Sequence, residues 1–156
     1  RAVEQTGIDG WLRERSLKEE ADMERGTKPI VVLETLTALG LILFWIGFFT
    51  VGLAPETPPP GYFVYEHAFP LPDLLLAAVL LVAARLLHRD RPAGRTLSLV
   101  CAGALTFLGV LDFSFNLQNG LYSISTLDLV LNAFINLWCG VLGCWITWRL
   151  HSKGGV

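Results

Sequence analysis

Four long apolar runs dominate this chain and constrain its fold more than any other feature. Roughly 20 helical residues are needed to cross the hydrocarbon core of a bilayer, and each run is close to that length or longer. The runs are rich in Leu and Ala and lack the two-residue alternation of a transmembrane barrel strand. We therefore expect an all-α integral membrane bundle of four transmembrane helices. The expected spans are residues 30–53, 71–87, 96–116 and 127–150.

The low charge content of the chain argues against a soluble fold. Only 17% of the 156 residues are charged and 53% are hydrophobic, whereas about a quarter of the residues in a soluble domain are charged. A net charge of −2 and only three cysteines also argue against a basic nucleic-acid binder and a disulfide-rich mini-protein. We therefore expect the lipid bilayer, and no nucleic acid, as a partner.

The basic residues all fall on one side of the expected bundle. All 12 Lys and Arg residues lie before the first run, near the end of the second run, or after Trp148. The two remaining connections, 54–70 and 117–126, contain none. Lys and Arg accumulate in cytoplasmic loops. The pattern predicts cytoplasmic N- and C-termini in a multi-pass protein of a plasma or inner membrane.

Short segments flank the four-helix transmembrane domain, which we place at residues 29–151. Residues 1–28 are a polar cytoplasmic segment, expected as a short surface helix or a polar tail, and residues 152–156 are a C-terminal tail. The three consecutive prolines at 58–60 favour a stiff extended turn after the first span. The aromatic residues after that turn predict a belt at headgroup level. They are Tyr62, Phe63, Tyr65 and Phe69.

Small and polar residues recur at helical spacing in the first, third and fourth spans. Because small residues allow helices to approach closely, these three stripes are expected to face one another. In the first span the stripe contains Glu34, Thr37, Gly40, Gly47 and Thr50. In the third span the stripe contains Ala102, Thr106, Gly109, Asp112 and Asn116. In the fourth span it contains Asp128, Asn132, Asn136, Cys139 or Gly140, and Gly143.

Glu34 and Arg85 lie at matching depths near the cytoplasmic edges of the first and second spans. A carboxylate in hydrocarbon needs a partner, so we predict a structural ion pair between them. An alternative hypothesis is that Glu34 exchanges a proton or cation, as the working residue of a homodimeric proton-coupled transporter.

Asp112 is the carboxylate that the sequence explains least. Asp73 lies in the first turn of its helix, where the helix dipole favours an acid. Asp128 follows Ser125 at capping-box spacing. Asp112 lies inside the third span, and no basic residue is present on that side of the membrane to neutralise it.

These residues predict an outward-facing acidic and amide pocket. Crowded carboxylates without counter-charges favour a bound cation or proton, so the pocket suits a small cationic or hydroxyl-bearing ligand. The alternative is a hydrogen-bonded seam that only fixes helix register. The predicted ligand-binding residues are Asp112, Asn116, Asp128, Asn132, Asn136 and Asp73.

Several membrane chemistries lack the residues that they need. The cysteines have no C-x-x-C spacing, the histidines lie outside the spans or at their edges, and no Lys lies within a span. These features argue against a thiol oxidoreductase, a transmembrane haem protein and a retinal protein. We predict neither a metal site nor a cofactor.

We therefore favour a non-catalytic ligand- or cation-binding module, or a subunit of a larger membrane complex. Four helices bury a thin core, and this favours self-association or other membrane subunits as partners. The alternative from another class is a membrane-embedded enzyme that acts on a lipidic substrate. Its catalytic residues would be Asp112, Glu66 and His67.

Overall fold

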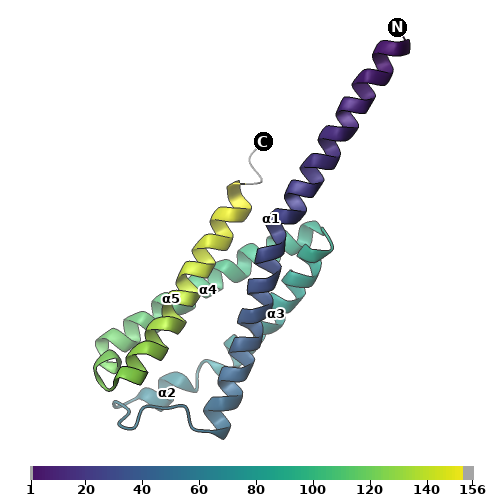
Figure 1. Ribbon diagram of the computed structural model, residues 1–156. Coiled ribbons are helices and arrows are strands. Elements are labelled where there is room, and N and C mark those ends of the chain that lie inside the picture. The colour runs from purple at the N-terminus through teal and green to yellow at the C-terminus, as the bar shows by residue number, and fades with distance from the viewer. Residues whose placement is uncertain (1, 153–156) are drawn as a thin grey trace.

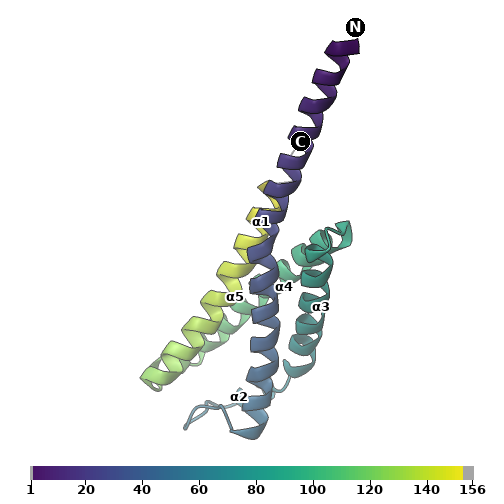
Figure 2. The same ribbon diagram turned by 45° about the vertical axis from the view of Figure 1, so that its right-hand side comes forward.

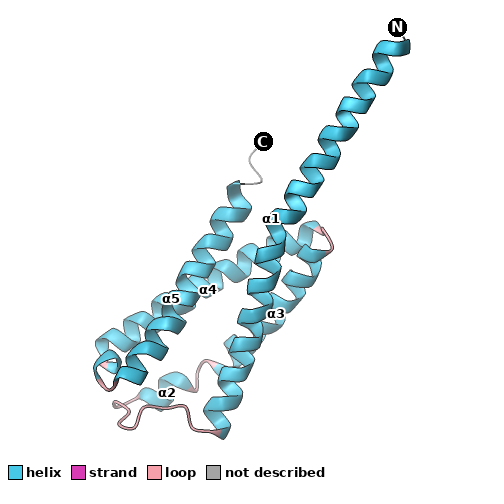
Figure 3. Cartoon of the chain, in the orientation of Figure 1, coloured by secondary structure: helices cyan, strands magenta, loops and turns pink. Residues whose placement is uncertain are grey.

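A computed structural model describes the backbone of residues 2–152 and the side chains of residues 11, 13–15, 17 and 26–152. Over this range the chain is helical and contains no strand, and loops are confined to the ends of the helices (Figure 3). The elements are α1 (Ala2–Thr50), α2 (Tyr62–Glu66), α3 (Pro70–His88), α4 (Pro92–Gln118), a short 3-10 helix η1 (Leu121–Ser123) and α5 (Thr126–Ser152).

Four segments of the described chain are long and apolar enough to cross a membrane, which confirms the four predicted spans. They are Gly26–Thr50, Tyr62–His88, Pro92–Gln118 and Thr126–Ser152. Large apolar side chains face outward along them; for example, Leu43 is 65% exposed and Phe107 is 68% exposed. An apolar exterior of this kind is stable in lipid and unstable in water. The chain is therefore a multi-pass membrane bundle.

The helices are connected up and down, so the bundle has two distinct ends (Figure 1). The terminal end holds the entry of α1 at Gly26, the turn between α3 and α4, and the end of α5. The loop end holds the 51–61 connection, α2 and η1. The start of α1 and the end of α5 therefore lie at the same end of the bundle.

α1 differs from the expected surface helix or tail, because residues 2–25 continue directly into the first span. α1 contains 49 residues and includes Pro29, and it projects well beyond the other helices (Figures 1 and 2). At about 1.5 Å per residue, α1 is roughly 73 Å long. The polar segment is rich in Glu and Arg, which are good helix formers, so it extends the helix instead of breaking it.

The main helix contacts join α1 to α3, α3 to α4, and α4 to α5. α4 and α5 approach closely at glycines, as the small-residue stripes predicted. A Cβ atom on Gly109 would lie 2.8 Å from the Asn136 carbonyl oxygen, and one on Gly143 would collide with Thr106 and Ala102. Glycine is therefore required at both positions for this packing.

α1 and α5 are joined by a side-chain hydrogen bond, without the close packing seen between α4 and α5. The Trp138 indole of α5 donates a hydrogen bond of 3.0 Å to the Thr37 hydroxyl of α1. Beside it lies a shallow groove of about 190 Å³, lined by Leu33, Trp138, Val141, Leu142 and Trp145. The Trp138–Thr37 hydrogen bond therefore links the first and last spans.

Candidate functional site

The candidate site lies at the loop end, where α3 begins with Asp73 in its first turn. Asp73 is only 6% exposed, and its Oδ2 atom accepts a hydrogen bond of 3.0 Å from the Trp45 indole of α1. Pro70 precedes Asp73 at the start of the helix, where the missing N–H of proline costs nothing. The predicted helix-start role of Asp73 is therefore correct, and the carboxylate also ties α3 to α1.

Asp112 lies across from Asp73 on α4 and is held by Tyr65 of α2. The Tyr65 hydroxyl donates a hydrogen bond of 2.9 Å to Asp112 Oδ1. The Tyr65 ring stacks on Phe115 at a centroid separation of 3.6 Å and an angle of 3°. Gly61, with a φ of 84°, lets the chain turn into α2, because this left-handed conformation disfavours residues with a Cβ.

Glu66 is the third carboxylate of this group. It lies close enough to Asp112 and Asp73 to be repelled by both, and it is half-buried. Asp112 and Asp73 also lie within electrostatic range of each other. We call Glu66, Asp73 and Asp112 the carboxylate cluster. The sequence has no Lys or Arg between Lys28 and Arg85 or between Arg95 and Arg149, so these helices provide no basic side chain near the cluster.

His67 does not complete the predicted group of catalytic residues. Its side chain is exposed and packs near Phe48 and Phe49, at centroid separations of 6.0 and 5.9 Å. Its Nδ1 atom lies 2.5 Å from the Phe63 carbonyl oxygen, one turn back on α2. The structure therefore brings Glu66 and Asp112 together, and it engages His67 in local contacts.

Asp128 and Asn132 make contacts within their own helix. The Ser125 hydroxyl donates to Asp128 Oδ2 at 2.6 Å, and the Asp128 backbone N–H donates to Ser125 Oγ at 3.1 Å. The second bond is the half of the predicted capping box in which the Ser125 side chain caps the helix. The Asp128 carboxylate accepts from the Ser125 hydroxyl, whereas in a full capping box it would accept from the Ser125 backbone N–H. The Asn132 amide donates to the Asp128 carbonyl oxygen at 2.9 Å. Both side chains therefore stabilise the start of α5.

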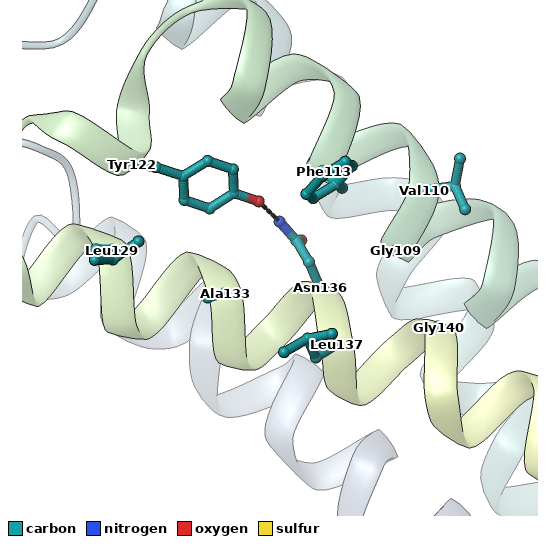
Figure 4. A pocket seen from close by; sticks show the side chains of 9 residues that line it. All are labelled: Gly109, Val110, Phe113, Tyr122, Leu129, Ala133, Asn136, Leu137 and Gly140. Atoms are coloured by element: carbon teal, nitrogen blue, oxygen red, sulfur yellow. Dashed lines mark hydrogen bonds between the residues drawn. The ribbon is translucent and has the colours of Figure 1, made fainter.

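Asn136 lies in a separate groove between α4 and α5 (Figure 4). Its Nδ2 atom donates a hydrogen bond of 2.8 Å to the Tyr122 hydroxyl, which reaches down from η1. The groove has a volume of about 470 Å³, and the other side chains in it are apolar. They come from Val110, Phe113, Leu129, Ala133 and Leu137. Asn116, 4% exposed, is buried at the loop end of α4.

The predicted ion pair between Glu34 and Arg85 is not formed. Glu34 is fully buried, and both of its carboxylate oxygens lack a hydrogen-bond partner. Arg85 is exposed because the buried face of α3 passes through Leu80, Ala84 and Leu87 and leaves Arg85 on the other side. Its long side chain can extend toward the headgroups from this position.

The prediction missed the aromatic partners that hold the cluster. Tyr62 and Tyr65 were assigned to a headgroup belt, but Tyr62 is only 6% exposed and Tyr65 binds Asp112. Phe63, at 47% exposure, is the belt member that does face outward. The helical spacing of Tyr62, Tyr65 and Phe69 was the available sign that these residues share a face that packs on the bundle.

Among the described side chains, no group of three or more His, Cys, Asp and Glu residues is arranged to hold a metal ion. Comparison with protein-family models, curated proteins and solved structures gives no match. The carboxylate cluster offers hydrogen-bond acceptors and negative charge, and its neighbours offer aromatic faces.

Proposed function

We propose that this chain is a non-catalytic membrane-embedded binding module whose carboxylate cluster holds a small molecule with a protonated amine. The observation that supports this proposal is the gathering of Glu66, Asp73 and Asp112 at one end of the bundle without a basic side chain. Carboxylates that repel one another in a partly desolvated place are stabilised by a cation. An amine supplies both the positive charge and N–H donors.

The fixed geometry of two of the carboxylates favours binding over proton-transfer chemistry. Trp45 and Tyr65 each donate to one oxygen of a carboxylate, and a carboxylate has further lone pairs for a ligand. The ring of Phe69, 4.7 Å from that of Tyr65, adds an aromatic surface of the kind that attracts cations. An uncharged hydroxyl-bearing ligand would gain only the hydrogen bonds, so we rank it second.

We further propose that the loop end faces outward and that both termini are cytoplasmic, in a plasma or inner membrane. The support is the restriction of Lys and Arg to the terminal end. In this orientation the carboxylate cluster is offered to ligands outside the cell or in the periplasm, and the projecting part of α1 lies in the cytoplasm.

Further membrane helices, from other subunits or from copies of this chain, are proposed as partners. No more than 33% of any spanning window is buried within the described chain. A bundle with so thin a core gains stability from association with other helices.

Ligand binding is tested with the full chain in lipid nanodiscs, titrated calorimetrically with hexylamine and with uncharged hexanol. Empty nanodiscs correct for partitioning into lipid. We expect hexylamine to bind at least about tenfold more tightly than hexanol, because its ammonium group adds an attraction between opposite charges that hexanol cannot make. D112N and D73N should weaken amine binding by a similar factor.

Glu56, which is exposed at the same end of the bundle, provides the matched control. E56Q should bind hexylamine as the wild type does. Equal binding of hexylamine and hexanol would contradict the proposal, as would amine binding that survives both D112N and D73N in folded protein.

A further inference from the structure

Glu34 occupies the half of the bundle opposite to the carboxylate cluster. It lies eight residues after Gly26, where the first span begins, and this corresponds to about 12 Å along α1. Its side chain is 0% exposed, and neither carboxylate oxygen has a hydrogen-bond partner. Trp45, which contacts the cluster through Asp73, lies roughly 16 Å farther along α1. Glu34 is therefore a separate feature from the proposed ligand site.

The polar neighbour of Glu34 is Ser98 of α4. Ser98 is also 0% exposed, and its hydroxyl oxygen has no hydrogen-bond partner within 3.5 Å, although it lies beside the Glu34 carboxyl. The buried thiol of Cys101, one turn farther along α4, is within electrostatic range of Glu34. α1 and α4 therefore bring two unpartnered polar side chains, Glu34 and Ser98, together in the buried core.

No described basic side chain neutralises Glu34. Arg85 of α3 is exposed on the far side of its helix, and Arg95 of α4 donates to the Leu150 carbonyl oxygen. Arg149 of α5 lies near the terminal end. The Thr37–Trp138 contact fixes the relative heights of α1 and α5, so Arg149 lies about 12 Å beyond Glu34 along the bundle.

The residues of α1 on either side of Glu34 belong to an apolar core cluster that also includes residues of α3, α4 and α5. The buried face of α3, which packs on α1, presents Ala77, Leu80, Ala84 and Leu87. On α5, Leu142 and Ile146 belong to the same core. An ionised carboxylate in such surroundings is highly unfavourable, and the usual response of the group is to take up a proton. A neutral carboxyl group has an O–H that the Ser98 oxygen can accept.

We propose that Glu34 and Ser98 form a proton-binding site in the terminal half of the bundle, where Glu34 is neutral at neutral pH and shares its proton with Ser98 Oγ. This site goes beyond the proposed ligand site, because it lies in the other membrane leaflet and binds a proton instead of an amine. The proton neutralises Glu34, which is the role predicted for Arg85. Arg85 cannot take this role because it lies on the exposed side of α3.

Infrared spectroscopy of the full chain in lipid nanodiscs at neutral pH tests the site. The carbonyl stretch of a protonated carboxyl is separated from the carboxylate bands. The spectrum of E34Q should lack one carboxylic band that the wild type shows, whereas the control E56Q should lose only carboxylate intensity. Loss of carboxylate intensity in E34Q would overturn the proposal, because Glu34 would then be ionised.

S98A keeps the test decisive if E34Q does not fold. This variant removes one buried hydroxyl and leaves Glu34 in place, so the carboxylic band should persist and shift in frequency. An unshifted band would exclude proton sharing with Ser98. The last measurement repeats the wild-type spectrum with added sodium chloride, which should leave the carboxylic band unchanged. Conversion of this band to carboxylate would indicate that the site binds a metal cation, and it would also overturn the proposal.

Discussion

Tyr65 and Asp112, which are 47 residues apart, are joined by a hydrogen bond of 2.9 Å between the phenol and the carboxylate. The contact fixes α2, a five-residue helix, against α4. A helix of this length has no stability of its own. The Tyr65–Asp112 bond and the Tyr65–Phe115 stack therefore hold the segment that carries Glu66 beside the other two carboxylates.

Replacing Tyr65 with Phe should lower the free energy of unfolding by about 1.5–3 kcal/mol, the usual range for a hydrogen bond to a charged group. Phe retains the ring that stacks on Phe115, so the loss of stability measures the contribution of the Tyr65 hydroxyl. The measurement is reversible unfolding in bicelles. In a double-mutant cycle with D112N, the two losses should be less than additive, and full additivity would show that the two side chains do not interact.

Replacing Gly109 with Ala should destabilise the bundle by about 1–3 kcal/mol, because the added Cβ overpacks the interface with α5. The new atom would lie 2.8 Å from both the Asn136 carbonyl oxygen and the Gly140 nitrogen. Gly103 of α4 has nothing within 4 Å of its would-be Cβ, which makes G103A the control. Equal unfolding transitions for the two variants would contradict the α4–α5 packing.

Replacing Trp138 with Phe should loosen the contact between α1 and α5. The variant loses the 3.0 Å hydrogen bond to Thr37, and such bonds within membranes contribute about 0.6 kcal/mol on average. W148F is the control, because Trp148 is 63% exposed on the same helix. In bicelles, the free energy of unfolding should be lower for W138F than for W148F. Equal values would show that the Trp138–Thr37 hydrogen bond does not stabilise the contact between α1 and α5.

The proposed topology predicts opposite labelling of two single cysteines by a membrane-impermeant maleimide. Glu56 lies exposed at the loop end, and Ala93 lies exposed in the first turn of α4 at the terminal end. E56C should react on intact cells, and A93C should react only after permeabilisation. The wild-type chain measures background from Cys144, its exposed native cysteine. The reverse pattern would place the termini outside.

The sequence predicts depth in the membrane better than it predicts the direction in which a side chain points. The four spans follow from hydropathy because lipid requires an apolar surface on every crossing helix. Glu34 and Arg85 were predicted to pair because their places in the sequence indicate matching depths. Their pairing failed because it also depends on the rotation of α3 about its axis, which is set by packing on α1 and α4.

The carboxylate cluster illustrates the same limit. Asp112 stood out as an unexplained acid, and Asp73 was placed correctly at a helix start. Tyr65 was not linked to Asp112 because the contact depends on how the 51–61 connection returns α2 to the bundle. Nothing local in the sequence specifies that return, whereas the Ser125–Asp128 cap involves residues three apart and was predicted directly.

Because α1 is one unbroken helix from Ala2 to Thr50, a rotation of its outer part would be transmitted into the bundle. The arm that precedes the first span, residues 2–25, is roughly 36 Å long, and the arm inside the bundle carries Glu34, Thr37 and Trp45. Rotation of the outer arm about the helix axis turns all three side chains together. Pro29 cannot donate a hydrogen bond to the preceding turn, so α1 would bend most easily there.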